Sequence, residues 1–545
     1  MRVLIFHGYL LQGTGSNVYN ANLAAALVRL GHEVHLLCQD RAPQELPFVD
    51  AIGDWDAGPL ALRALREPVR CTVYRPALAG LLPVYVADRY EGVEARPYPD
   101  CSDEEIDAYV AANVRAVRDV LARARPDVAL ANHLVMGPLV LARALPPAVP
   151  YAAKIHGSAL EYVVAPHPRR FLPAAREGLA GARAVLVGSG HVADRLVATL
   201  GDEALRERIR LGPPGVDVAR FAPRPGAEAR LALGALADRL ARQAAVQAPA
   251  AGEGERSAFA RDAGEAAAAL ADVAAGSEDR LVAFVGKLIV SKGIDLLIAA
   301  WPLVLEREPR ARLVVVGFGA YRGGVERLIA ALADDDRATL AALVAAGRAE
   351  EGGPRAPLRL LGAFLDALAR DEYGRERYRR AAAALRERVV LTGRLDHDEL
   401  ADVLPACEAL VVPSTFPEAF GMVAAEGAAC GALPVCAGHS GLAEVAGALA
   451  GAAPAPARPW LAFPLPGRSA AGVAGDGDAG EPVRAIAERL LAWLEAPTDV
   501  RRETREALVA TVRERWSWEG VARGVIAAAG ANADAPAGAG EPPPR

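Results

Sequence analysis

The chain has 545 residues, more than one hydrophobic core normally holds, so two or three domains are expected. Hydrophobic residues make up 52% of it, enough for large cores, and the net charge of −6 gives no reason to expect nucleic acid as a partner. The six cysteines are scattered without a C-x-x-C pair, which argues against a disulfide framework or a zinc site and favours a reducing, cytoplasmic compartment.

The N-terminal part alternates short apolar runs with amphipathic stretches, the pattern of β-α-β units in a parallel sheet. Residues 1–7 are too few to cross a membrane, and no later window forms an uninterrupted membrane span, although peripheral membrane contact stays open. A helix is predicted over residues 18–30. Strands are predicted over residues 3–6, 34–38, 128–131, 152–155 and 184–187.

Polar residues follow these strands, and in open parallel sheets ligands bind outside the carboxyl ends of the strands. His156 directly follows the strand at 152–155, which makes it a candidate site residue, although a lone histidine is as often structural. His133 has the same placement after the strand at 128–131, with weaker support.

A glycine-rich loop precedes the first predicted helix. Gly13 and Gly15 lack a Cβ, so their backbone can approach a phosphate or a sugar closely. An ordinary strand-to-helix turn explains the loop equally well by itself, and the G-x-G-x-x-G dinucleotide fingerprint is absent.

A second series of strands follows a linker at residues 213–217. These strands are predicted over residues 281–285, 313–316, 389–391, 409–412 and 433–436. The fold class is therefore α/β, with two Rossmann-like doubly wound domains that face a cleft.

Two segments interrupt the second series, at residues 226–279 and 331–386, and both are expected to be insertions, helical or partly mobile, on the domain surface. The acidic run at 334–336 is interpreted as a solvated helix end, because no histidine or spaced carboxylate supports a metal site. Residues 451–480 are expected to form a loop, and residues 532–545 a disordered tail.

Two lysines lie in the loop after the strand at 281–285. Lys287 and Lys292 stand in an otherwise apolar segment, with Gly286 and Gly293 at the ends of the turn. Two solvated lysines would be the simplest explanation. Two ammonium groups beside a helix start would also neutralise a diphosphate leaving group.

The stretch at residues 413–426 runs from a buried strand through a proline-containing turn into a helix. Glu418 stands where the helix begins, and Glu426 lies about 12 Å further along at about 1.5 Å per residue. Helix N-termini attract anions. A long ligand with a phosphate in its middle and hydroxyls at both ends, such as a sugar nucleotide, suits this pattern.

Taken together, these segments resemble the retaining glycosyltransferases of family 4, which have the GT-B fold. The resemblance covers most of the chain in order, and the E-x7-E segment with its flanking Phe-Gly and Gly-x-x-Pro is its most specific part. The other matching segments are residues 13–34, 156–157, 214–221, 286–293, 316–319, 391–394, 441–444 and 516–518.

The resemblance implies a role for each candidate residue. Lys287 and Lys292 would hold the donor diphosphate, Glu418 would bind hydroxyls of the donor sugar, and Glu426 would bind the ribose diol. His156 would approach the sugar and the reacting centre, so His156, Lys292 and Glu418 form the expected catalytic set.

Further residues are expected to bind the donor. The N–H groups of residues 419–422, which include Phe420, Gly421 and Met422, would fix the sugar and phosphate. Gly393 and Arg394 would flank the base, and the backbone at Gly13 and Gly15 would pass close to the diphosphate. No metal and no cofactor is expected.

Two positions depart from the family pattern. Lys287 stands where the family commonly has arginine, which keeps the charge but loses the bidentate fork. Ser440-Gly441 replaces a Gly-Gly pair before the last glutamate, which would alter that loop.

The resemblance implies an N-terminal acceptor domain over residues 1–215, completed by a C-terminal helix at about 512–530, and a donor domain over 216–511. The expected function is transfer of a sugar from a UDP- or GDP-type nucleotide sugar to a hydroxyl of a sugar, lipid-linked or small-molecule acceptor, with retained configuration. A sugar-nucleotide epimerase and a non-catalytic sugar-nucleotide-binding scaffold remain as alternatives. A phosphorylase is disfavoured, because no pyridoxal-binding lysine can be identified.

Overall fold

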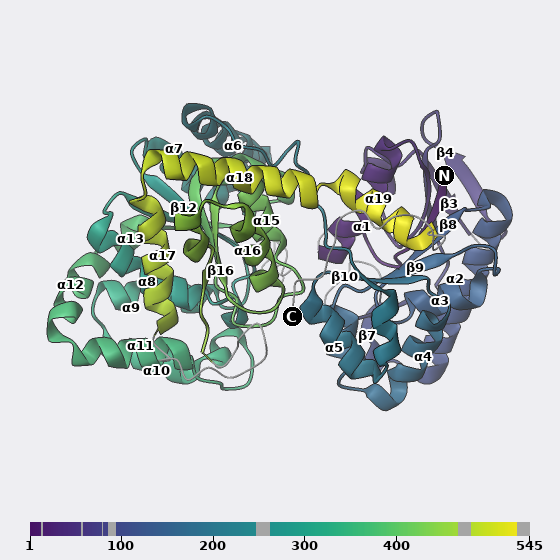
Figure 1. The fold of residues 1–545 in the computed structure, drawn as a ribbon, viewed down its shortest axis with the longest axis horizontal. Coiled ribbons are helices and arrows are strands. Elements are labelled where there is room, and N and C mark those ends of the chain that lie inside the picture. The colour runs from purple at the N-terminus through teal and green to yellow at the C-terminus, as the bar shows by residue number, and fades with distance from the viewer. Residues whose placement is uncertain are drawn as a thin grey trace. The chain divides into compact units, whose positions relative to one another are not determined.

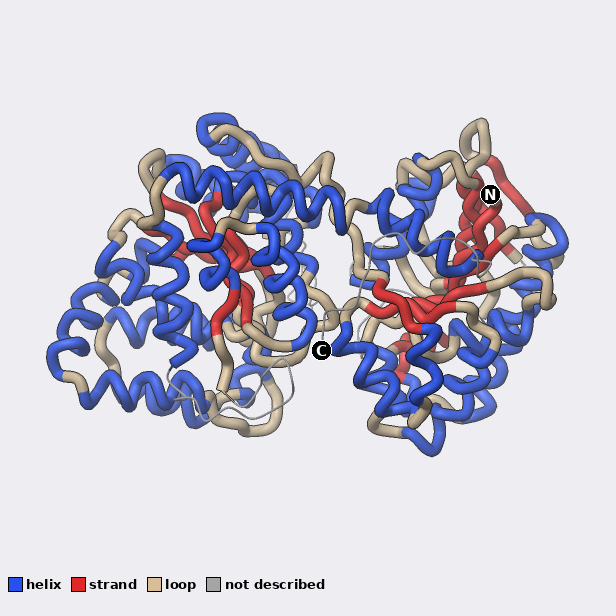
Figure 2. Tube along the Cα trace, in the orientation of Figure 1, coloured by secondary structure: helices blue, strands red, loops and turns tan. Residues whose placement is uncertain are grey.

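The computed structural model describes residues 1–11, 15–55, 58–78, 80–85, 94–246, 262–466 and 481–530. The chain divides into two units, one of residues 1–215 together with the residues from Trp516 onward, and one of residues 216–515. Each unit contains a mainly parallel sheet with helices packed on it (Figures 1 and 2). Gly13 and the predicted tail at 532–545 lie outside the described residues.

The first unit is built on a nine-stranded sheet in the order β11-β10-β9-β8-β1-β2-β5-β3-β4. Among the strand pairs that the structure describes in this sheet, β3–β4 is antiparallel and the others are parallel. A separate parallel pair joins β6 (Leu81–Val84) to β7 (Glu94–Pro97). The sheet strands are β1 (Arg2–Phe6), β2 (Glu33–Leu37), β3 (Ala51–Asp54), β4 (Ala61–Ala64), β5 (Cys71–Arg75), β8 (Val128–Asn132), β9 (Tyr151–Lys154), β10 (Ala184–Val187) and β11 (Ile209–Leu211).

The last helix of the described residues, α19 (Trp518–Gly530), packs into the core of the first unit. Trp518 is only 2% exposed, and its ring lies 5.5 Å from that of Tyr19 between centroids. A Cβ at Gly215 would come within 2.5 Å of the Trp518 ring, so the close approach requires glycine there. The other helices are α1 (Gly15–Arg29), α2 (Asp103–Ala124), α3 (Gly137–Ala144), α4 (Pro168–Ala180) and α5 (Gly190–Leu200).

The second unit has an all-parallel six-stranded sheet in the order β14-β13-β12-β15-β16-β17. Its strands are β12 (Arg280–Val285), β13 (Ala311–Val316), β14 (Val389–Gly393), β15 (Cys407–Val412), β16 (Leu433–Ala437) and β17 (Ala462–Phe463). Its main helices are α8 (Ile294–Arg307), α9 (Arg322–Ala333), α14 (His397–Val403), α15 (Met422–Ala429), α16 (Ser440–Ala452), α17 (Glu481–Leu494) and α18 (Thr498–Arg515).

Two expectations about chain segments differ from the structure. The described part of the loop expected at 451–480 contains the end of α16, a short helix over Ala455–Leu461 that packs against α16 and α17, and the edge strand β17, while residues 467–480 lie outside the described residues. The helix expected at about 512–530 is two helices, since α18 ends at Arg515 in the second unit and α19 starts at Trp518 in the first.

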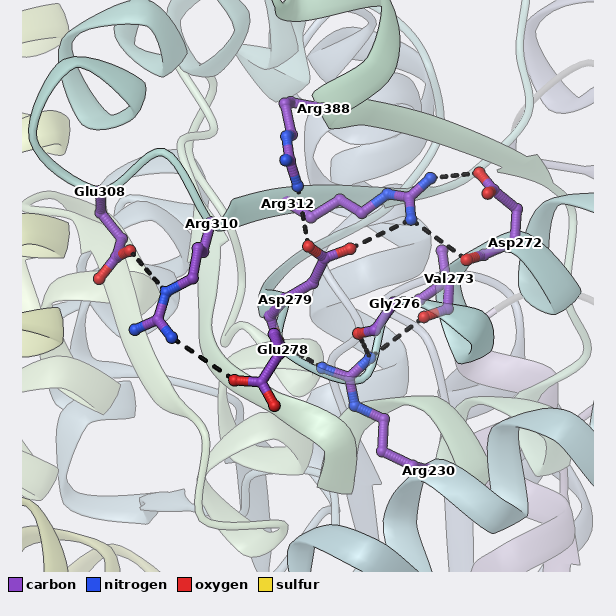
Figure 3. A network of polar contacts seen from close by, with 10 residues as sticks. All are labelled: Arg230, Asp272, Val273, Gly276, Glu278, Asp279, Glu308, Arg310, Arg312 and Arg388. Atoms are coloured by element: carbon purple, nitrogen blue, oxygen red, sulfur yellow. Dashed lines mark hydrogen bonds and ion pairs between the residues drawn. The ribbon is translucent and has the colours of Figure 1, made fainter.

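The described part of the insertion at 226–279 is a pair of packed helices, α6 (Gly226–Val246) and α7 (Ala263–Ala275). A charged network fastens it to the sheet (Figure 3). Arg230 of α6 donates to the carbonyl oxygens of Val273 and Gly276, and Arg312 of β13 pairs with Asp272 and with Asp279 at 3.2 Å. The described residues of this insertion are therefore helical and packed against the sheet.

The insertion at 331–386 is also helical and packed on α8. Tyr378 is 4% exposed, and its hydroxyl donates to the Ala299 carbonyl at 2.8 Å. In the acidic run, Asp336 caps α10 by accepting from the Thr339 N–H at 3.0 Å, and Asp334 pairs with Arg386. The helices are α10 (Arg337–Ala346), α11 (Arg359–Arg370), α12 (Glu372–Ala382) and α13 (Leu385–Arg388).

Within the described ranges, no helix combines the length and the apolar character that crossing a bilayer requires.

Candidate functional site

Two loops at the carboxyl edge of the second sheet bring Lys292 and Glu418 together. The turn between β12 and α8 packs directly on the loop after β15, where the Thr415 N–H donates to the Ser291 carbonyl at 2.9 Å. Gly293 has a φ of 68°, and a Cβ there would lie 2.0 Å from the Pro413 carbonyl oxygen. Glycine at this position therefore permits the contact that places Lys292 beside the loop after β15, which contains Glu418 and is called the glutamate loop below.

Glu418 is the centre of a polar cluster. Its Oε1 pairs with the Lys292 ammonium group and accepts a hydrogen bond from the Ser414 hydroxyl at 2.7 Å. The side chains of Lys292 and Glu418 are 32% and 24% exposed, so a ligand can reach both. The pair holds the two candidate catalytic groups of this unit in fixed positions.

The turn between β16 and α16 is hydrogen-bonded to the glutamate loop. The Glu418 N–H donates to the Ser440 hydroxyl at 2.9 Å, and the Gly441 N–H donates to the Glu418 carbonyl at 3.0 Å. His439, buried in the same turn, donates from Nε2 to the Ser414 carbonyl at 2.8 Å. Ser440 has a φ of 52°, an unfavourable value for a residue with a side chain. Its hydroxyl accepts the hydrogen bond that fixes the Glu418 backbone.

Glu426, the residue expected to bind ribose, is 2% exposed and accepts a hydrogen bond from His397 Nε2 at 2.7 Å. Burial would lower the pKa of His397, but the charge and hydrogen bond of Glu426 outweigh burial and raise that pKa above 6.5. The Phe221 ring packs on the imidazole, with centroids 4.9 Å apart. Sequence reasoning missed His397, because nothing near it in the chain indicates its partner in α15.

The first turn of α15 follows Glu418 directly. Phe420 is buried, Gly421 precedes the helix with a φ of 111°, and Met422 is the first helical residue. A Cβ at Gly421 would approach Leu442 Cδ2 to 2.5 Å, so the turn needs glycine both for its backbone and for its packing. The N–H groups at this helix start suit an anion.

The remaining candidates of the second unit lie in neighbouring turns. Gly393 ends β14 with a φ of 71°, and the Arg394 guanidinium lies 5.8 Å from the Phe318 ring centroid. Lys287 is exposed in the turn after β12, and the next N–H, from Leu288, donates to the Phe318 carbonyl at 2.7 Å. The turns after β12, β13 and β14 are thus packed together on the same edge as Lys292.

In the first unit, His156 follows β9 and donates from Nε2 to Asn132 Oδ1 at 2.8 Å. Burial and the neighbouring His133 and Lys154 lower the pKa of His156 well below 6.5, so the imidazole is neutral at neutral pH. Gly15 is the exposed first residue of α1, and a Cβ there would meet no atom within 4 Å. Packing within the protein therefore does not require glycine at this position.

His156 is one of three imidazoles gathered at the carboxyl edge of the first sheet. His133 lies between His7 and His156, with ring centroids 5.7 and 4.9 Å away. Asn20 links the group by donating to His7 Nδ1 at 3.0 Å and to Asn132 Oδ1 at 3.2 Å. His133 was a weak candidate in the sequence and His7 was missed, although each follows a buried strand, which was the available signal.

The two units, each with its polar residues at the carboxyl ends of parallel strands, define the GT-B class of glycosyltransferase fold. Two family descriptions match the chain: glycosyl transferases group 1 over residues 269–452, and glycosyl transferase 4-like domain over residues 14–215. The chain therefore belongs to the GT-B glycosyltransferases that combine a 4-like N-terminal domain with a group 1 C-terminal domain, and it is a transferase.

Curated relatives and solved structures agree with this membership. The chain is 26% identical to the D-inositol 3-phosphate glycosyltransferase of Actinosynnema mirum over 432 residues, which cover 75% of this chain and 81% of the relative. It is similar in fold to sucrose-phosphate synthase from Thermosynechococcus elongatus (TM-score 0.52, 19% identity, 96% of each chain). It also resembles HepE of Anabaena in complex with UDP and glucose (TM-score 0.50, 15% identity, 96% of this chain and 98% of that one).

Proposed function

We propose that this protein transfers a sugar from a UDP- or GDP-type nucleotide sugar to an acceptor hydroxyl, with retained configuration and without a metal. The observation that carries the proposal is the Glu418–Lys292 cluster beside the first turn of α15. A carboxylate for sugar hydroxyls, an ammonium group for phosphate and free helix N–H groups then lie on one sheet edge.

The buried Glu426–His397 pair supports the nucleotide end of the donor site. A charged carboxylate held by a histidine accepts hydrogen bonds from two adjacent hydroxyls, as a ribose diol presents them. Arg394 and Gly393, in the neighbouring turn, are the candidates for contact with the base. HepE of Anabaena forms a complex with UDP and glucose, which favours a nucleotide-sugar donor here as well.

Retention fits the surroundings of Glu418. Its carboxylate is engaged by Lys292 and Ser414, which suits a group that orients sugar hydroxyls and not a free nucleophile. We therefore infer same-face displacement, in which the leaving phosphate, stabilised by Lys292 and the α15 N–H groups, accepts the proton of the acceptor hydroxyl. His156 would orient the transferred sugar as a neutral hydrogen-bonding group.

The experiment that tests the proposal is a thermal-shift screen of the full chain against UDP-, GDP- and ADP-sugars, followed by transfer assays with the stabilising donor. Glu418→Ala and Lys292→Ala are expected to lower kcat/KM by about 100-fold or more, as loss of one transition-state contact typically does. The exposed Glu278→Ala is the matched control. Full activity in both site variants would overturn the site assignment.

The alternatives predict other results in the same assay. An epimerase would convert the donor sugar without an acceptor, whereas a transferase would release it only by slow hydrolysis. A sugar-nucleotide-binding scaffold would bind donor tightly without turnover across a broad acceptor panel. Activity that survives EDTA supports the metal-free mechanism, and a chelator-sensitive rate would contradict it. The cytoplasmic location remains a prediction that fractionation of the native cells would check.

A further inference from the structure

The opposite edge of the second sheet carries a depression of about 1080 Å³. Its lining includes Leu281 at the start of β12, Glu408 at the start of β15, the first turn of α6 and one face of α18. The proposed donor residues follow the carboxyl ends of the same strands. The depression is therefore at the amino edge of the sheet and is separate from the proposed donor site.

Arginine dominates the lining. Six arginines face three acids, Asp279, Glu408 and Glu506, a formal surplus of three positive charges. The arginines are Arg224, Arg230, Arg501, Arg502, Arg505 and Arg513.

Two of the acids in the lining, Glu408 and Asp279, each contact more than one arginine. Glu408 lies 2.5 Å from Arg505 and 3.6 Å from Arg501, and it also faces Arg280 at 3.7 Å. Asp279 pairs with Arg312 and Arg388, neither of which lines the depression (Figure 3). Glu408 and Asp279 thus each serve several guanidinium groups. Outside the lining, Asp402 pairs with Arg224 at 2.8 Å and Glu503 lies 3.9 Å from Arg502, and the lining itself keeps more guanidinium groups than carboxylates.

Arg230 and Arg501 illustrate the shortage of carboxylate partners for the arginines in the lining. Among the described residues, Arg230 donates to the carbonyl oxygens of Val273, Gly276 and Asp279 and to no carboxylate, while burial lowers its pKa (Figure 3). Burial also lowers the pKa of Arg501. In the part of the chain that the structure describes, the buried Arg501 Nε has no hydrogen-bond partner.

We propose that this depression binds a small phosphate-bearing metabolite, with Arg501 and Arg502 of α18 as its principal phosphate ligands. A guanidinium fork matches phosphate oxygens in a bidentate way, and an anion in the depression would supply a counter-charge to Arg501, which shares Glu408 with Arg505. The volume slightly exceeds the range of about 300–1,000 Å³ typical of sites for small ligands, so it is large enough for such a molecule. Val509 and Ala510, on the same face of α18, offer an apolar wall to the rest of the molecule.

Calorimetric titration of the full chain with inorganic phosphate and with glucose 6-phosphate tests the proposal. We expect saturable binding that Arg501→Gln/Arg502→Gln weakens by about ten-fold or more, since two charged contacts are lost. Arg337→Gln, a change at an exposed arginine of α10, is expected to bind like the wild type. Arg502→Gln alone, at a side chain that is 66% exposed, repeats the test without disturbing the interior.

Separation from the proposed donor site is tested with Lys292→Ala. Phosphate binding is expected to persist in this variant and in the presence of saturating UDP. Loss of binding in Lys292→Ala, or competition by UDP, would assign the phosphate to the loop of Lys292 and overturn the proposal. Equal affinity in the wild type and the arginine double variant, or binding of anionic phosphatidic acid vesicles but not of glucose 6-phosphate, would also overturn it.

Discussion

His397 and Glu426 form a hydrogen-bonded pair, 2.7 Å from Nε2 to Oε1, between the first residue of α14 and the middle of α15. Glu426 is almost inaccessible to solvent, and Phe221 covers the imidazole. The pair therefore couples the protonation of a histidine to the packing of two helices at the proposed nucleotide end of the site.

The first prediction concerns the pH dependence of this pair. Because the folded state raises the pKa of His397, the pair stabilises the protein fully below the unfolded pKa of 6.5, and that stability is lost as the pH rises through the higher folded value. Glu426→Gln should therefore cost more unfolding free energy at about pH 6 than at about pH 8.5 in urea titrations. It should also weaken binding of the donor nucleotide by about ten-fold or more. A cost that does not vary with pH would contradict the assignment, and Glu326→Gln serves as the surface control.

The second prediction separates backbone strain from steric contact. Gly293 and Gly352 have φ values of 68° and 78°, but only Gly293 faces a neighbouring carbonyl oxygen, whereas a Cβ at Gly352 meets nothing within 4 Å. Gly352→Ala should cost about 1–2 kcal/mol of unfolding free energy from strain alone. Gly293→Ala should cost more and should also weaken donor binding, because it separates Lys292 from Glu418. Equal effects of the two changes in both assays would show that the contact does not matter.

The third prediction uses the two functions of Ser440. Ser440→Gly removes the strain of a positive φ, about 1–2 kcal/mol, and loses a hydrogen bond of about 1 kcal/mol, so stability should change little. Ser440→Ala keeps the strain and loses the bond, so it should destabilise by about 1 kcal/mol. Chemical denaturation gives both values. A stabilised Ser440→Ala variant would show that the hydrogen bond from the Glu418 N–H to the Ser440 hydroxyl does not stabilise the fold.

The fourth prediction concerns His7. Burial is the main cause that lowers its pKa to about 4, and its hydrogen bonds to Asn17 and the Leu10 carbonyl act in the opposite direction. Between pH 6.5 and about 4 the unfolded chain binds a proton that the folded chain does not, so stability falls as the pH falls, by about 1.4 kcal/mol per pH unit for this group. His7→Gln should reduce the slope of unfolding free energy against pH, and an unchanged slope would contradict this prediction. His133 and His156 act in the same direction, so part of the slope should remain.

Among the sequence signals, an apolar run that ends at a polar residue predicted the strands and the site positions best. Apolar runs followed by polar residues identified β1, β8, β9, β12 and β15 to within about two residues and placed His156, Lys292 and Glu418 at carboxyl edges. The pattern did not predict β3, β4, β5 or β11, although β3 and β5 are largely buried. All four residues of β4 are exposed, and β11 has only three residues, so neither produces a clear apolar run.

Partners from distant loops could not be predicted in the same way. His397 is 29 residues from Glu426, and Ser440 is 22 residues from Glu418, and neither distance corresponds to a local period. Only the order of strands in the sheet brings these residues together. The arginines of α18 likewise look like those of a solvated helix until the starts of β12 and β15 are placed beside them.

The strand order of the second sheet has a consequence for the newly made chain. Lys292 and Glu418 are 126 residues apart, because β13 and β14 intervene in the sequence while β15 lies next to β12 in space. During synthesis, β12 keeps one unpaired edge until β15 leaves the ribosome, and an unpaired edge can capture strands of other chains. Truncated translation products that end before β15 would therefore lack the Lys292–Glu418 pair and would depend on chaperones to stay unaggregated.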